Sequence, residues 1–265
     1  MTITRTAPHV GELLRRWREQ RRLSQLELAL QAEVSTRHLS FVETGRAAPS
    51  RDMVLHLADQ LDVPLRERNQ LLLAAGYAPV YSHVALDSPP LAEVRGAVRA
   101  IIEAHAPNPA VVVDRYWNMV DANSGISIFT DGITPAMLMP PVNIMRLSLH
   151  PDGAASRIVN LGQWRAHLLG RLRREIARTA DAELEQLYEE VRRYPCEDAA
   201  VEADVPGPGD VVVPLRYRAI GHELAFFSTV VAFGTPLDIT VDELAIELFF
   251  PVDSATARLL RREGR

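Results

Sequence analysis

The sequence contains no lysine, because all 29 basic residues among its 265 are arginines. An all-arginine composition can reflect GC-rich coding, and arginine also suits bidentate contacts to phosphate and guanine. Cysteine is nearly absent as well. Cys196 is the only one, which excludes an intrachain disulfide and indicates an ordinary thiol rather than a redox sensor.

Long apolar runs are also missing. No stretch reaches the roughly 18 to 20 apolar residues that a membrane-spanning helix requires. The opening segment, MTITRTAPHVGELLRRW, lacks the apolar core of a secretory signal peptide, so we expect a cytoplasmic protein with no membrane partner. A hydrophobic fraction of 47% with 24% charged residues is typical of globular proteins, and the length allows one large or two ordinary domains.

Catalytic and metal-binding signatures are absent too. The eight histidines are scattered without metal-ligand spacing, and the sequence has no Gly-x-Ser-x-Gly elbow, phosphate-binding glycine loop or dinucleotide fingerprint. Acidic pairs such as Glu189-Glu190 fall on predicted helical faces, where solvation accounts for them. The sequence therefore predicts a protein that is not an enzyme and that holds no metal.

Charge is divided unevenly along the chain. Residues 1–76 hold 11 Arg against 9 Asp and Glu, a net charge of +2. Residues 77–265 hold 18 Arg against 25 acidic residues, a net charge of -7, so that the whole chain has -5. This asymmetry indicates a domain boundary near residue 76, with the positive charge on the first domain.

The first domain, residues 1–76, is predicted to be all-α. Ser24 and Glu27 have the spacing of a capping box, in which each side chain bonds a backbone amide at the helix start. Leu26, Ala29 and Leu30 are expected to form the buried side of that helix. Five helices are expected. The first covers about residues 9–21, the second begins after its cap Ser24 and the third after its cap Ser35. The fourth runs from Ser50 to Leu61 and the fifth from Pro64 to about Gly76.

The third of these helices has the composition of a helix that enters a DNA groove. Leu39 and Val42 form its inner face and Gly45 ends it, whereas its first residues are polar. In a helix-turn-helix, the N-terminal side chains of the second helix of the pair contact base edges. Side chains at the start of the preceding helix and after the exit are suited to backbone phosphates. The predicted DNA contacts are Gln25, Ser35, Thr36, Arg37, His38, Ser40, Arg46 and Arg51.

The combination LSQ…LA…VS…LS…ETG within residues 23–45 resembles the Xre family of bacterial and phage repressors. The shared features are the Gln after Ser, the small residue in the second helix and the Glu-x-Gly ending. Glu33 departs from the pattern, because many relatives have glycine before the turn. The resemblance implies binding to double-stranded DNA, and we expect a homodimer because one such domain reads too few base pairs. A helical bundle with solvated polar faces is the alternative that amphipathic spacing alone leaves open.

A Pro- and Tyr-rich linker, residues 77–90, precedes a second domain over residues 91–265. Two short strands are expected within residues 110–123, then helices, a loop over 204–210, three β-rich segments and a short helix over 254–262. Strands at both ends of a domain must join in one sheet to bury their apolar faces. The predicted fold class is therefore α+β, with an N-terminal five-helix domain and a C-terminal PAS-like domain of antiparallel sheet with helices on one side.

Four segments of the second domain resemble the MmyB-like ligand-binding domain that follows an Xre-type helix-turn-helix in many bacterial regulators. They are LLLAAGYAP, NPAVVVDRYWNMVDAN, PLRYR…ELAFFSTVVAFGTPLDIT and IELFFPVDSATARLL, and they run from about residue 71 to residue 260. The resemblance implies a PAS-like fold and a transcription factor that responds to a small molecule. Apolar or fatty-acid-like ligands are expected, and no other cofactor.

Aromatic residues in the sheet and in the opposing helices supply surface for an apolar ligand pocket, although core packing also accounts for each of them. A ligand carboxylate would require an arginine, and Arg115, Arg146, Arg157 and Arg165 are candidates that could equally lie on solvated helix faces. Phe249 is a further aromatic candidate. The predicted ligand-binding residues are Trp117, Asn118, Asn123, Asn143, Arg146, Trp164, Arg165, Phe226, Phe227 and Phe233.

Three functions are compatible with the sequence. The leading one is a regulator whose operator binding responds to the ligand. In the second, the C-terminal domain is a ligand-free module for dimerisation or protein interaction, which a packed interior would support and a cavity of several hundred Å³ would contradict. The third, an enzyme carrying its own regulator, would require titratable groups converging in a cleft.

Overall fold

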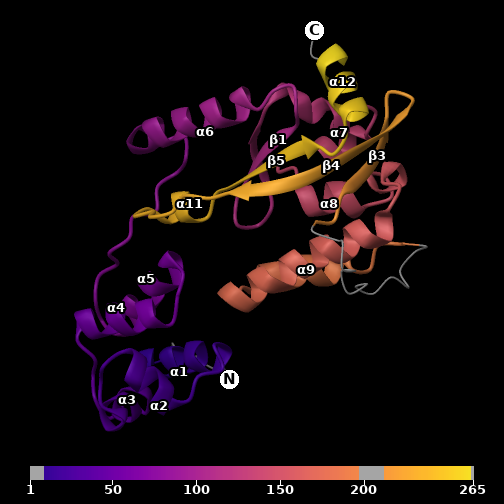
Figure 1. Cartoon of the computed structure of the whole chain (residues 1–265). Helices are drawn as coiled ribbons and strands as arrows, with labels where there is room; N and C mark the ends of the chain where they lie inside the picture. Colours follow the sequence, from indigo (N-terminus) through magenta and orange to yellow (C-terminus); the bar gives the residue numbers. More distant parts are fainter. Residues whose placement is uncertain (1–8, 197–211, 264–265) are drawn as a thin grey trace, which may run out of the picture. The chain divides into compact units, whose positions relative to one another are not determined.

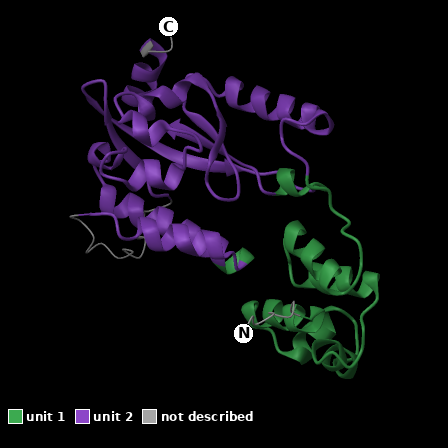
Figure 2. Cartoon of the chain, turned by 180° about the vertical axis from the view of Figure 1, so that it is seen from behind, with its two compact units in different colours: residues 1–83, 177–179, 236–242 green, residues 84–176, 180–235, 243–265 purple. Residues whose placement is uncertain are grey.

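The computed structural model describes residues 9–196 and 212–263, so the predicted loop over 204–210 lies outside the described residues. The chain forms two compact units, coloured separately in Figure 2. The first comprises Met1–His83 with Ala177–Thr179 and Pro236–Asp242, and the second comprises Val84–Ile176, Ala180–Thr235 and Glu243–Arg265. Each unit has its own hydrophobic core.

The first unit contains the five predicted helices. Ser24 and Glu27 form the predicted capping box, in which Ser24 Oγ accepts from the Glu27 amide at 3.2 Å and Glu27 Oε2 accepts from the Ser24 amide at 2.7 Å. Ser35 and Ser50 cap the next two helices through the serine oxygen alone, which accepts from the amides of His38 and Met53. The helices are α1 (Val10–Gln20), α2 (Gln25–Gln31), α3 (Thr36–Glu43), α4 (Arg51–Gln60) and α5 (Leu65–Ala74).

The buried face of α2 differs from the prediction. Ala29 is buried as expected, but Leu26 and Leu30 are 58% and 70% exposed. The core side of this short helix is formed instead by Leu28 and Ala29, followed one turn later by Ala32. Positions four apart share a helix face, so Leu28 and Ala32 lie on one face and Leu26 and Leu30 on the opposite one. With the first face in the core, the second is exposed.

The second unit is built on one five-stranded sheet with the strand order β2-β1-β5-β4-β3 (Figure 1). Every neighbouring pair is antiparallel. The two early strands thus join the three late ones, as the burial requirement predicted. The strands are β1 (Ala110–Val113), β2 (Met119–Ala122), β3 (Leu215–Ala219), β4 (His222–Val231) and β5 (Ala245–Pro251).

Helices cover both faces of this sheet, whereas helices on one side only were expected. The larger core lies between one face and the helices α7 to α10, and a smaller core packs Val98 and Ile102 of α6 against Val112 and Ile246 on the other face. All four residues of β1 are buried, which requires cover on both sides. The helices are α6 (Ala92–Ala104), α7 (Ser127–Thr130), α8 (Ile144–Leu149), α9 (Leu161–Thr179), α10 (Ala182–Val191) and α12 (Ser254–Glu263).

Short elements complete the fold. The 3-10 turns are η1 (Pro89–Leu91), η2 (Ser124–Ile126), η3 (Pro135–Leu138) and η4 (Ala155–Arg157), and α11 (Ile239–Asp242) belongs to the first unit. None of the helices in the described part of the chain combines the length and the apolar character needed to cross a membrane.

Candidate DNA-reading helix and ligand cavity

The helix α3 buries its apolar side and leaves its polar side accessible. Leu39 and Val42 are 1% and 0% exposed, whereas Arg37 is exposed and its guanidinium lies 5.4 Å from the Phe41 ring centroid. Ser35 Oγ accepts from the His38 amide at 3.1 Å, so Ser35 begins this helix. The other predicted contacts of α3 and its exit, Thr36, His38, Ser40, Arg46 and Arg51, are all partly or fully exposed. The arrangement is that of a helix able to meet base edges.

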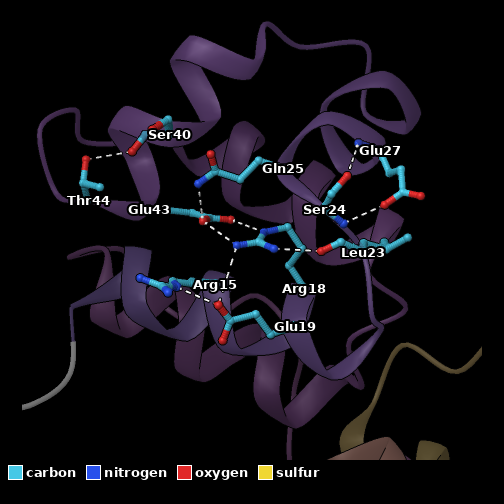
Figure 3. Close-up of polar contacts among 10 residues, drawn as sticks. All are labelled: Arg15, Arg18, Glu19, Leu23, Ser24, Gln25, Glu27, Ser40, Glu43 and Thr44. Atoms are coloured by element: carbon cyan, nitrogen blue, oxygen red, sulfur yellow. Dashed lines mark hydrogen bonds and ion pairs between the residues drawn. The ribbon is translucent and has the colours of Figure 1, made fainter.

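A buried ion pair holds this helix to its neighbours (Figure 3). Arg18 of α1 donates to the Glu43 carboxylate twice, Nε to Oε1 at 2.6 Å and Nη2 to Oε2 at 2.9 Å. Its third nitrogen, Nη1, donates to the Leu23 carbonyl at 2.7 Å. Gln25 Nε2 donates to Glu43 Oε2 at 2.7 Å, which orients the amide predicted to contact phosphate. The network therefore ties α1, the start of α2 and the end of α3 together.

Two backbone positions allow the helices to approach closely. Glu33, in the turn before α3, has φ +52, the left-handed conformation that the glycine of many relatives adopts readily. Gly11 of α1 lies against α3, since a Cβ there would come within 2.2 Å of the Val42 carbonyl oxygen. The sequence indicated Glu33 and, through the Glu-x-Gly ending, Glu43, but it did not indicate Gly11 or Arg18 as determinants of the motif.

A small apolar cavity lies in the second unit, between the sheet and the helices. Its volume is about 50 Å³, well below the roughly 300 Å³ or more of pockets that enclose drug-sized ligands. The interior is therefore nearly filled by side chains. The lining residues are Val111, Trp117, Met119, Ile126, Phe129, Thr130, Ile144, Leu147, Ser148, Ala154, Ile158, Trp164, Leu168, Leu215, Tyr217, Glu247 and Phe249.

Of the aromatic candidates, the structure brings Trp117, Trp164 and Phe249 together at the cavity. Phe226 is fully buried beside it, with its ring centroid 5.3 Å from that of Phe129. The Phe227 ring stacks on that of Phe250 in the adjacent strand β5, with the ring centroids 5.3 Å apart. Phe233 packs against the smaller core on the α6 side of the sheet. These three do not line the cavity among the described residues.

The three asparagines hold backbone segments together. Asn123 accepts from the Ala110 amide and donates to the carbonyls of Ile102 and Asn108. Asn143 caps α8 and donates to Asn118 Oδ1 at 3.1 Å, while Asn118 Nδ2 donates to Asp114 at 3.0 Å. The amides of Asn118 and Asn143 fix the turn that carries Trp117, and Asn123 joins the end of α6 to the start of β1. None of the three appears in the cavity wall that the structure describes.

The four candidate arginines each bind a protein group. Arg115 pairs with Asp181 and with Glu243, the latter at 2.7 Å, and Arg146 forms a two-pronged pair with Glu190 at 2.8 and 2.7 Å. Arg157 donates to the carbonyls of Asp131 and Gly132, and Arg165 donates to the Arg192 carbonyl. Within the described chain, none of the four lines the cavity.

An ion pair that the sequence analysis missed lies at the cavity instead. Glu247 of β5 is 4% exposed and lines the cavity, and its Oε1 lies 2.5 Å from Nη1 of Arg171 on α9. The Arg171 guanidinium in turn lies 4.6 Å from the centroid of the Trp117 ring. Burial raises the pKa of Glu247, and the Arg171 cation opposes that rise. The signal in the sequence was a single acid inside the apolar strand AIELFFP.

A helix-turn-helix unit joined to a PAS-like unit defines the class of DNA-binding regulators with a ligand-binding domain. A family model for a helix-turn-helix domain matches residues 9–71, and the model for the MmyB-like transcription regulator ligand binding domain matches residues 94–262. The second match covers more than half of the chain, and the chain belongs to this family. Comparison with curated proteins gave no match. Within the described residues, no three His, Cys, Asp or Glu side chains converge as metal ligands.

Proposed function

We propose that the protein is a bacterial, cytoplasmic regulator of the Xre type whose operator binding is modulated by a small apolar ligand. The observation that carries the proposal is an accessible polar face on α3 in the same chain as an apolar cavity walled by Trp117 and Trp164. The family assignment supports both halves, since one matched model is a helix-turn-helix and the other a ligand-binding domain.

For DNA, α3 enters the major groove and Arg37, the exposed cation of its first turn, contacts base edges. Gln25, held by Glu43, contacts a phosphate through the remaining donor of its amide, and Arg46 and Arg51 neutralise phosphates at the exit. A homodimer doubles the number of base pairs read and supplies the specificity that one such unit lacks.

For the ligand, the apolar wall favours an apolar body such as a hydrocarbon chain, as in a fatty acid. The present volume of about 50 Å³ requires that side chains move aside when a larger molecule enters. Met119, Ile126 and Ile144 line the cavity and are only partly buried, which makes them the easiest to displace. The ligand modulates operator binding only to the extent that it binds the two states of the regulator with different affinity.

A second candidate is a ligand-free second unit that serves dimerisation or binds another protein. The small cavity favours it, because a nearly packed interior needs no ligand for stability. The DNA-binding role is the same in both candidates, so the two differ only in whether the cavity takes a molecule.

Native mass spectrometry on the full chain purified from cells separates them. We expect a dimer that carries a small molecule, which denaturation releases. Ala154→Leu fills the cavity from its wall and should abolish the retained mass while the dimer and operator binding persist. An apo dimer would favour the interaction module, and an apo monomer would contradict both the ligand and the dimer.

A further inference from the structure

The cavity has an apolar wall with one charged group, Glu247. The other polar groups of the wall are the hydroxyls of Thr130, Ser148 and Tyr217 and the indole N–H groups of Trp117 and Trp164. The Tyr217 hydroxyl already donates to the Phe129 carbonyl at 3.1 Å. A molecule that enters the cavity therefore meets a carboxylate and no cation of the described wall. This arrangement restricts the chemistry of the polar end of a ligand.

Glu247 keeps acceptor capacity that the protein leaves unused. Its Oε1 is buried and lies 2.5 Å from Arg171 Nη1, and Arg171 is the one described residue that pairs with this carboxylate. A carboxylate has about four acceptor positions, so the Arg171 pair leaves most of them unused. Buried polar atoms ordinarily have a hydrogen-bond partner, because leaving one unpaired forfeits its hydration without replacement. Since Glu247 lines the cavity, a donor on a bound molecule can occupy one of the remaining acceptor positions of its carboxylate.

The ion pair also sets the net charge that the site accepts. Arg171 and Glu247 together are neutral, and Arg171 lies over the Trp117 ring, so both charges are held in place, that of Glu247 in the wall and that of Arg171 next to it. A ligand carboxylate would place a second negative charge beside Glu247, and a ligand ammonium would repel Arg171 and bury a net positive charge. A pure hydrocarbon would leave the remaining acceptor positions of Glu247 unused. A neutral donor avoids all three penalties.

We propose that the cavity selects a neutral, apolar molecule that carries a single hydrogen-bond donor such as a hydroxyl, and that Glu247 accepts this hydrogen bond. Arg171 is a positioning residue, which favours the ionised form of Glu247 and holds its carboxylate at the cavity. The inference rests on the proposed function, in that the cavity takes a ligand. The inferred ligand has a neutral head group in place of the carboxylate of a fatty acid.

The test compares four probes of one chain length on the full protein: 1-octanol, octyl methyl ether, octanoate and octylamine. Binding is followed by calorimetry and by tryptophan emission, to which Trp117 and Trp164 contribute from the cavity wall. We expect octanol to bind about tenfold more tightly than each of the other three, because it alone satisfies Glu247 without adding charge.

Variants test whether the Arg171–Glu247 pair determines the preference for octanol. Glu247→Gln removes the negative charge and leaves the Arg171 cation, so the preference should shift from octanol to octanoate. Glu190→Gln makes the same change in the exposed pair with Arg146 and should leave the order of the probes unchanged. If Glu247→Gln fails to fold, the double replacement Arg171→Met with Glu247→Leu removes both charges, and octanol should then lose its advantage over the ether.

Octanoate binding most tightly to the unaltered protein would overturn the inference in favour of Arg171 as an anion site, and equal binding of all probes would overturn it as well. Binding of no probe, together with an apo protein in native mass spectrometry, would remove the ligand role altogether. Binding of the probes in the wrong order would remove only the assignment of Glu247.

Discussion

Arg18 and Glu43 are joined by two parallel hydrogen bonds, of 2.6 and 2.9 Å, in the interior of the DNA-binding unit. The Glu43 side chain is only 1% exposed and that of Arg18 9%. The hydrogen bond to Glu43 raises the pKa of Arg18 further, so the guanidinium stays charged. A buried pair of this geometry fixes how α1 and α3 pack, because either charge alone would be unstable there.

Replacing Arg18 by Ala should therefore destabilise the helix-turn-helix by about 3–5 kcal/mol, since it leaves the Glu43 carboxylate buried and unpaired. Hydrogen exchange of the α1 to α3 amides measures the loss locally. Arg15→Ala, which breaks the exposed pair with Glu19, serves as control and should change little. Unchanged exchange in Arg18→Ala would show that the pair contributes nothing to the packing.

Glu33→Gly should stabilise the first unit by about 0.5–1 kcal/mol. A residue with a Cβ is strained at φ +52, and glycine relieves that strain at a smaller cost in unfolded-state entropy. Urea unfolding measures the gain, and Glu33→Ala, which keeps the Cβ, should show none. A loss of stability in the glycine variant would mean that the Glu33 side chain itself contributes to the turn.

Arg37→Ala should weaken binding to the specific operator by about 1–3 kcal/mol and relax base preference, because Arg37 is the exposed cation of the predicted groove-reading turn. Fluorescence anisotropy over a range of salt concentrations measures both. Arg95→Ala removes the same charge from the second unit and is the matched control. Affinity and base preference that stay the same in Arg37→Ala would place the recognition surface elsewhere.

Asn123→Ala should destabilise the second unit by about 2–4 kcal/mol, because it removes three hydrogen bonds to the backbone and leaves buried groups unpaired. Thermal unfolding measures this loss. The affinity of the folded variant for a cavity ligand should be unchanged, since Asn123 does not line the cavity among the described residues. A selective loss of ligand affinity without loss of stability would restore the binding role expected from sequence.

His167 should make stability fall as the pH falls from about 6.5 towards 4. Burial lowers the pKa of His167 to about 4, and the nearby charges of Arg171 and Arg174 add to this effect. Between these two pKa values His167 binds a proton in the unfolded chain but not in the folded chain. The full stability is therefore present above the unfolded pKa, and protonation of the unfolded chain lowers the free energy of unfolding by on the order of 1–3 kcal/mol as the pH falls towards 4.

Melting temperatures measured across this range should fall less in His167→Gln than in the unaltered protein. His222→Gln, which alters an exposed histidine at the start of β4, should follow the unaltered protein. Parallel curves for all three proteins would show that His167 does not titrate in this window.

Local patterns predicted much of the fold. The serines at 24, 35 and 50 begin α2, α3 and α4, and the capping box at Ser24 forms as its spacing requires. The helix-turn-helix and the MmyB-like domain agree with the matched models, and the early and late strands join in one sheet. The Leu26 and Leu30 assignment was wrong, because a seven-residue helix with four leucines and alanines offers two apolar faces, and only the neighbouring helices select one.

The residues that line the cavity could not be predicted from the sequence. Aromatic residues were expected to mark it, and Trp117 and Trp164 reach it whereas Phe226, Phe227 and Phe233 do not. Phe227 follows Phe226 on β4 and therefore occupies the opposite face of the sheet, whereas Phe226 lies on the cavity side and is packed beside the cavity. The arginines chosen for a ligand instead bind acidic side chains and carbonyls of the protein.

The sequence by itself determined the helix starts, the strand content and the charge of each part of the chain, because caps, periodicity and composition act over a few neighbouring residues. Only the tertiary structure decided that Arg18 meets Glu43 across 25 positions and that Arg171 meets Glu247 beneath Trp117. These partners are distant in sequence and are brought together by packing, so no local pattern specifies them. The same packing leaves a carboxylate rather than a cation in the cavity wall.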